Sequence, residues 1–167
     1  MTVTTDAKLV LTTPSDLEVV GTRVFDAPRE LVFRAFNDPD LLARWWSPRS
    51  NSLVVEAMDT RVGGRWRYVL DPDENGNGIA FSGEYREITP PVRIARTFNF
   101  EPVGPGHEVL ETVEFEELEG GRTRMTSTSL FLRVEDRDGM LRSGMESGYS
   151  ESLETLSALL AELQASA

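Results

Sequence analysis

Apolar and polar positions along the chain change period twice, and the changes divide it into segments of different structure. Between residues 52 and 131 apolar side chains recur at every second position, which is the period of a half-buried β-strand. Residues 29–46 and residues 134–163 instead repeat every three or four positions, as amphipathic helices do. The pattern therefore predicts an α+β domain in which antiparallel strands pack against helices.

One strand and two short helices are predicted to come before the long series of strands. Residues 17–25 are rich in β-branched side chains and end at Asp26, a candidate helix cap. Pro28 and Pro39 each stand at the opening turn of a helix, where the missing N–H costs nothing. Because each helix has only two or three turns, we expect both to be stable only when docked on the sheet.

The last predicted hairpin turns through Glu-Gly-Gly at residues 119–121. A three-residue loop sets Phe115 opposite Met125, whereas a two-residue loop would pair it with an arginine. Because a slip of one residue sends every side chain to the other face, the apolar pairing favours the three-residue loop. That register places Glu111 opposite Ser129 and directs a carboxylate toward the interior.

Helical spacing from Val134 to Leu163 predicts one long C-terminal helix with a single apolar stripe. Its first half is interrupted by Gly139, Gly144 and Gly148, and each glycine costs roughly 1 kcal/mol relative to alanine in a helix interior. Two explanations stay open: close packing of the helix backbone on the sheet, or space left for a ligand.

Length, charge and cysteine content narrow the class of protein. A chain of 167 residues suits one domain, which we place at residues 17–167, after a mobile N-terminal arm at residues 1–16 that has an edge strand as its alternative. The 28 acidic and 17 basic residues give a net charge of −11, which repels nucleic acids and anionic membranes. The lack of cysteine and of any signal or membrane-spanning segment predicts a cytoplasmic protein.

The order of the predicted elements describes a helix-grip fold, a curved antiparallel sheet wrapped around a long C-terminal helix, with two short helices after strand one. Besides the helix pair, four motifs follow in order: R-W-W-S-P at Arg44–Pro48, G-G-R-W at Gly63–Trp66, G-E-Y-R-E-I-T-P-P at Gly83–Pro91 and E-S-G-Y-S-E-S-L-E-T-L at Glu146–Leu156. Together they resemble the START-like superfamily, often abbreviated SRPBCC. Within it, the chain looks like the bacterial branch similar to the C-terminal domain of the heat-shock-protein ATPase activator.

The resemblance implies a function, because relatives in this superfamily hold lipids, sterols, polyketides or other apolar molecules between sheet and helix. We therefore expect binding of a small, largely apolar ligand in that cavity. The alternatives are a cyclase- or hydrolase-type enzyme using the same cavity and a co-chaperone-like interaction module; a homodimer is left open. The chain departs from the branch at Gly148-Tyr149, where Gly-Trp is usual.

The residues expected to contact the ligand are aromatic, polar or on the last helix, although core packing alone would also require most of the aromatic ones. They are Trp46, Trp66, Tyr68, Phe81, Phe98, Arg96, Glu111, Ser127, Met140, Gly144, Met145 and Tyr149. For Arg96 and Glu111 we expect an ion pair that satisfies itself, because a buried charge needs a partner. Ligand orientation and acid/base catalysis by Glu111 are the alternatives.

No cofactor, metal site or catalytic residue is predicted. With no cysteine and one histidine, a transition-metal site would depend almost entirely on carboxylates. His107 follows a Gly-Pro-Gly loop and is predicted to be a surface histidine, and no G-x-S-x-G elbow provides a serine nucleophile.

Overall fold

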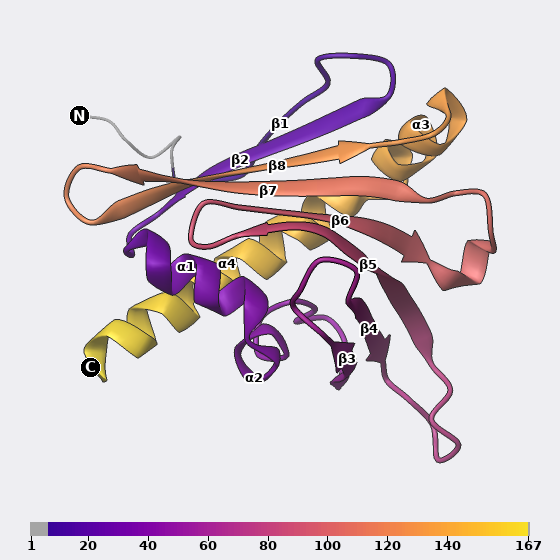
Figure 1. Cartoon of the computed structure of the whole chain (residues 1–167), viewed down its shortest axis with the longest axis horizontal. Helices are drawn as coiled ribbons and strands as arrows, with labels where there is room; N and C mark the ends of the chain where they lie inside the picture. The colour runs from indigo at the N-terminus through magenta and orange to yellow at the C-terminus, as the bar shows by residue number, and fades with distance from the viewer. Residues whose placement is uncertain (1–6, 167) are drawn as a thin grey trace.

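Eight antiparallel strands form one curved sheet in the computed structural model, which describes residues 7–166 (Figure 1). The order across the sheet is β1-β2-β8-β7-β6-β5-β4-β3, so the chain crosses from β2 to the far edge and then returns strand by strand. The strands are β1 (Val10–Thr12), β2 (Glu18–Phe25), β3 (Leu53–Met58), β4 (Arg65–Leu70), β5 (Ile79–Thr89), β6 (Arg93–Phe100), β7 (Val109–Leu118) and β8 (Arg122–Leu130).

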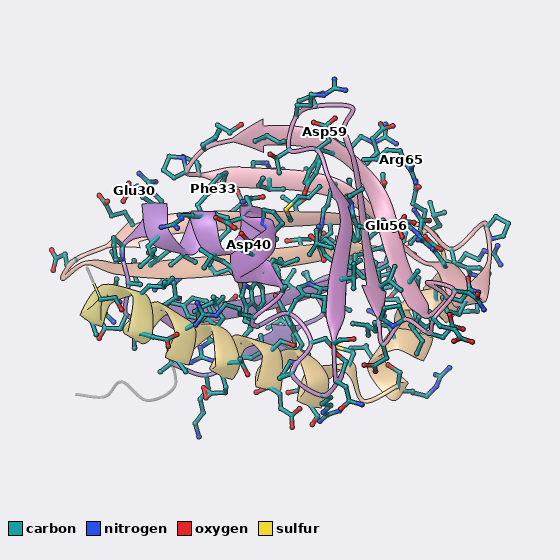
Figure 2. All side chains as sticks on the ribbon, turned by 90° about the horizontal axis from the view of Figure 1, so that it is seen from below. Glu30, Phe33, Asp40, Glu56, Asp59 and Arg65 are labelled. Atoms are coloured by element: carbon teal, nitrogen blue, oxygen red, sulfur yellow. The ribbon has the colours of Figure 1, made fainter. Side chains whose placement is uncertain are left out.

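The helices lie on the inner side of this sheet, and α4 crosses it diagonally (Figure 1). They are α1 (Arg29–Asn37), α2 (Pro39–Leu42), α3 (Val134–Arg142) and α4 (Met145–Ala165). A 3-10 turn, η1 (Glu101–Val103), follows β6 in its connection to β7. Figure 2 shows the arrangement from below, with α4 running alongside the long strands and side chains filling the space between. This is the predicted helix-grip architecture.

The two short helices begin at the predicted prolines, but only one of them has the expected cap. Asp38 caps α2, because its side chain accepts hydrogen bonds from the backbone N–H groups of Asp40 at 2.9 Å and Leu41 at 3.3 Å. Asp26 was predicted to cap α1, and this is wrong. Pro28 occupies the capping position of α1 and no side chain bonds to that end, because α1 begins at Arg29, two residues later than a cap at Asp26 requires.

Part of the N-terminal arm belongs to the sheet. Strand β1 pairs antiparallel with β2, with Val10 opposite Thr22 and Thr12 opposite Val20. Residues 10–12 therefore form an edge strand, which was the alternative to the predicted mobile arm. Residues 1–6 of the arm lie outside the described part of the chain.

The predicted register of the last hairpin is confirmed. Phe115 lies opposite Met125 and Glu111 lies opposite Ser129 across the three-residue turn. The glycine at 120 has φ +77°, in the left-handed region that favours glycine. The carboxylate of Glu111 consequently shares the inner face with Phe115.

The long C-terminal helix is present, but its predicted start at Val134 is wrong, because the chain breaks at Gly144 and the long helix begins at Met145. This residue has φ +84°, and it separates α3 from α4. Gly144 therefore ends one helix and begins another. A side chain at Gly148 would point toward Arg49, with 3.8 Å between its Cβ and Nη1. Of the three glycines, Gly139 alone lines the cavity between sheet and helices, so the explanation by ligand space applies to that glycine and not to the other two.

The two ends of α4 differ in how much side chain they bury. Leu153, Leu156 and Leu160, which lie from the middle of α4 toward its C-terminus, are fully or almost fully buried in one core with Phe25 of β2 and Val32 of α1. The first two turns of α4, before Ser152, have no buried residue, and neither does α3. The core is thus filled under one end of α4, which leaves the inner face of the sheet less covered at the other end.

Replacing Gly144 by alanine should lower the free energy of unfolding by about 1 kcal/mol, because a Cβ is strained in the left-handed conformation. Gly139→Ala is the matched control, because Gly139 lies inside α3 and the new Cβ would meet nothing within 4 Å. This variant should raise the free energy of unfolding by up to about 1 kcal/mol. Urea unfolding of both variants measures the difference. Equal effects would mean that the helix does not break at Gly144.

Candidate functional site

A cavity of about 960 Å³ lies between the inner face of the sheet and the helices α3 and α4. Most of the side chains that line it are aromatic or aliphatic. They include Phe36, Trp45, Trp46, Phe81, Tyr85, Ile94, Phe98, Phe100, Val109, Val113, Phe115, Phe131, Met140, Met145 and Tyr149. The alternation of β6 explains three of them, since Ile94, Phe98 and Phe100 share one face of that strand.

Nine of the twelve residues predicted to contact a ligand line this cavity. They are Trp46, Phe81, Phe98, Arg96, Glu111, Ser127, Met140, Met145 and Tyr149. The other three, Trp66, Tyr68 and Gly144, do not. Gly144 is the break between helices, described above.

Trp66 and Tyr68 lie one layer behind the cavity wall, which corrects their predicted position. Both are fully buried. Their rings pack against each other at 4.7 Å between centroids, and side chains that do line the cavity cover them: Trp46 lies 5.1 Å from Tyr68 and Phe98 lies 5.5 Å from Trp66. The alternation of β4 correctly identified them as inward-facing. At this strand, however, inward-facing side chains enter the packed core and not the cavity.

A row of polar side chains crosses the otherwise apolar wall. Arg96, Glu111 and Ser129 stand directly opposite one another on three adjacent strands, β6, β7 and β8. The guanidinium Nε of Arg96 donates to Oε1 of Glu111 at 2.8 Å, so the expected ion pair is present. The row runs across the middle of the sheet, where the register of the last hairpin places it.

Arg96 is held as a cation by its surroundings. Its Nη1 donates to the hydroxyl of Tyr68 at 2.8 Å, and its guanidinium carbon lies 3.9 Å from the centre of a Trp66 ring. Burial alone would lower the pKa of Arg96, but Tyr68, Glu111 and Tyr85 outweigh burial, and the pKa is raised. Trp66 and Tyr68 therefore contribute to the site by supporting Arg96.

Two tyrosine hydroxyls lie near this row. Tyr149 of α4 donates to Oγ of Ser127 at 2.8 Å, and burial raises the pKa of Tyr149. The departure from Gly-Trp at this position thus adds a hydrogen bond between helix and sheet. Tyr85, opposite Arg96 on β5, has a buried hydroxyl with no partner among the described residues, and burial raises its pKa as well.

His107 was predicted to be a surface histidine, and this is wrong. It is half-buried and lines the cavity, and its Nδ1 lies 3.0 Å from Oδ1 of Asp136 on α3. Asp136 was not singled out from the sequence because nothing in the chain order places the start of α3 beside the loop before β7. The pair joins that loop to α3 across one end of the cavity.

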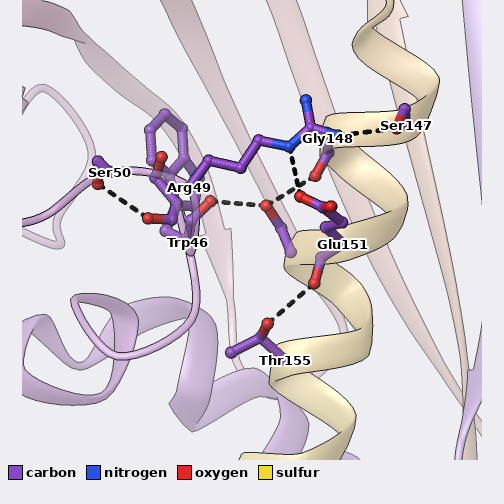
Figure 3. Close-up of polar contacts among 9 residues, drawn as sticks. Trp46, Arg49, Ser50, Ser147, Gly148, Glu151 and Thr155 are labelled. Carbon is purple, nitrogen blue, oxygen red and sulfur yellow. Dashed lines mark hydrogen bonds and ion pairs between the residues drawn. The ribbon is translucent and has the colours of Figure 1, made fainter.

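Contacts from the loop after α2 to α4 fix the position of Trp46 (Figure 3). The hydroxyl of Ser152 donates to the backbone carbonyl of Trp46 at 2.8 Å, and Arg49 Nη2 donates to Ser147 at 2.8 Å. Arg49 also forms an ion pair with Glu151. These contacts explain how an irregular loop holds an indole ring against the cavity.

Within residues 7–166, no group of three or more His, Asp or Glu side chains could hold a metal ion. None of the helices described here is long and apolar enough to cross a membrane.

Several solved structures are similar to this one. A protein from Rhodobacter sphaeroides superposes with a TM-score of 0.82 at 24% identity, over 93% of this chain and 99% of that chain. Protein Ms6760 from Mycobacterium smegmatis gives a TM-score of 0.77 at 26% identity, over 93% and 99% of the two chains. Protein CV1439 from Chromobacterium violaceum gives 0.72 at 29% identity, over 86% and 97%.

No curated protein matches this chain. The sequence profile described as "Activator of Hsp90 ATPase homolog 1-like protein" matches residues 26–161, from the end of β2 through most of α4. That match covers the helix pair, strands β3 to β8 and most of the C-terminal helix, so the chain belongs to the family of proteins that resemble activator of Hsp90 ATPase homolog 1.

Proposed function

We propose that this protein binds a small, largely apolar molecule in the cavity between the sheet and α4. The observation that carries the proposal is the cavity itself, at about 960 Å³ with a mainly aromatic and aliphatic wall and a few converging polar groups. Sites for small molecules commonly have this size and composition. The fold supports the proposal too, because the resemblance to START-like proteins implies an internal binding cavity.

The two alternatives have less support. A co-chaperone-like interaction module would have a filled interior and an exposed apolar patch, whereas here the space is inside. An enzyme using Glu111 as an acid or base would need a second reacting group beside it. The nearest charged group is Arg96, which is already bonded to Glu111 and Tyr68.

The proposed partner is the small molecule alone, not nucleic acid or a membrane surface. A net charge of −11 opposes both. We also propose a cytoplasmic location, because a chain without cysteine is suited to a reducing compartment.

Filling the cavity should abolish binding of a neutral apolar dye such as N-phenyl-1-naphthylamine. Ser129→Phe places a ring inside, since Ser129 lines the cavity. Thr128→Phe is the matched control, because the neighbouring residue on a strand points to the opposite face. We expect dye fluorescence to show at least tenfold weaker binding for Ser129→Phe and unchanged binding for Thr128→Phe. Equal affinity in both variants would contradict binding at this site.

Removing the charge of Glu111 tests whether its pair with Arg96 supports the fold. Glu111→Gln leaves a buried cation without its anion, which costs about 3 kcal/mol or more when both groups are fully buried. Because the Glu111 side chain is 24% exposed and that of Arg96 is 10% exposed, we expect a loss of about 2 kcal/mol in the free energy of unfolding.

The matched control for this variant is Glu114→Gln, on the same strand but on the outer face, where Glu114 pairs with Arg93 in an exposed ion pair. Exposed pairs contribute about 0–1 kcal/mol. Urea unfolding at neutral pH compares the two variants. If they lose the same stability, the inner pair does not support the fold.

A further inference from the structure

The polar row in the cavity wall has hydrogen-bonding capacity that the protein does not use. Arg96 occupies Oε1 of Glu111, but no residue in the described part of the chain donates a hydrogen bond to Oε2. The hydroxyl of Ser129, directly opposite on β8, likewise has no described partner. Both residues line the cavity, and the Glu111 side chain is 24% exposed.

Unused polar atoms in an apolar wall are informative about what enters the cavity. Oε2 of Glu111 is not fully enclosed by protein. A ligand that displaces water from it must therefore supply a donor, because a desolvated carboxylate oxygen without one is costly. Ser127, the other serine of this wall on β8, is already bonded to Tyr149. The unused acceptor at Glu111 therefore calls for a donor that the ligand brings.

Charge in and around the cavity excludes an anionic group on the ligand. The positive charge of Arg96 is already balanced by Glu111 at 2.8 Å. The other acidic side chains in the wall, Glu135 and Asp136, belong to α3, and Asp136 pairs with His107. A carboxylate ligand would thus meet no uncommitted cation in the described wall and would be repelled by three acidic residues.

A cationic group gains little at Glu111 itself, because that carboxylate already neutralises Arg96 at 2.8 Å and the cation would lie beside the guanidinium. A neutral hydroxyl fits both constraints. It can donate to Oε2 of Glu111 and at the same time accept from the unpaired hydroxyl of Ser129, since an alcohol or phenol has one donor and two acceptor positions.

We infer that Glu111, held in place by Arg96, makes this cavity selective for neutral apolar molecules that carry a hydroxyl group. The hydroxyl donates its hydrogen to Oε2 of Glu111, and the apolar body of the ligand packs against the aromatic wall. This inference rests on the function proposed above and names the chemical class of its ligand.

The test compares three probes that share one ring system: 2-naphthol, 2-methoxynaphthalene and 2-naphthoate. Equilibrium dialysis at neutral pH measures the affinity of each for the full chain. A hydrogen bond to a charged acceptor should make 2-naphthol bind about tenfold more tightly than 2-methoxynaphthalene, which keeps the oxygen but has no hydrogen to donate. The naphthoate should bind more weakly than either.

Variants identify the residue responsible. In Glu111→Gln the preference for 2-naphthol over its methyl ether should fall to about twofold, because the acceptor is no longer charged. Glu114→Gln, on the outer face, should keep the full preference. Should Glu111→Gln fail to fold, the double variant Arg96→Met/Glu111→Leu replaces both charges with apolar groups of similar size, which proteins often tolerate, and it should bind both neutral probes equally.

The outcomes separate this inference from the proposed function. Equal binding of 2-naphthol and 2-methoxynaphthalene by the unaltered protein would overturn the selectivity and leave the binding function standing. Tighter binding of 2-naphthoate, or a full preference retained in the Glu111 variants, would overturn it too. If no probe binds, and the dye N-phenyl-1-naphthylamine does not bind either, the proposed function falls with it.

Discussion

The burial of leucine side chains along α4 from Leu153 onward is the interaction on which the rest of the structure depends. Leu153, Leu156 and Leu160 are each at most 1% exposed, and burying one such side chain contributes about 1.5–3 kcal/mol. These contacts fix α4 against α1 and the sheet at one end. Because the fold is held there, the other end of the inner face can stay open without loss of the domain.

Features of the fold that depend on residues close together in the sequence were predictable, and those that depend on distant residues were not. Strands and short helices follow from local periodicity, and the register of the last hairpin follows from pairing Phe115 with Met125. The full burial of Trp66 and Tyr68 could not be predicted in this way, because alternation shows which face of the sheet a side chain is on but not how deeply it is buried. Depth depends on how strongly the sheet curls, which many weak contacts decide together.

The candidate site shows the same division between local and long-range information. Arg96 and Glu111 were predictable as partners, since both face inward on what the meander makes neighbouring strands. The pairing of His107 with Asp136 was not, because 29 residues separate them and the helix break at Gly144 decides where α3 lies. A lone histidine after a glycine-rich loop is more often at the surface, and here a helix without any buried residue covers it.

The separation of α3 from α4 has a consequence for how such a protein can diverge. Because α3 buries no residue, its side chains can be exchanged with little cost to the stability of the domain, whereas exchanges in the C-terminal half of α4 would damage the core. Yet α3 supplies Met140 and Asp136 to the cavity wall. Mutation can therefore reshape one end of the cavity for a new molecule while the domain continues to fold, so specificity and stability evolve on different segments of the same chain.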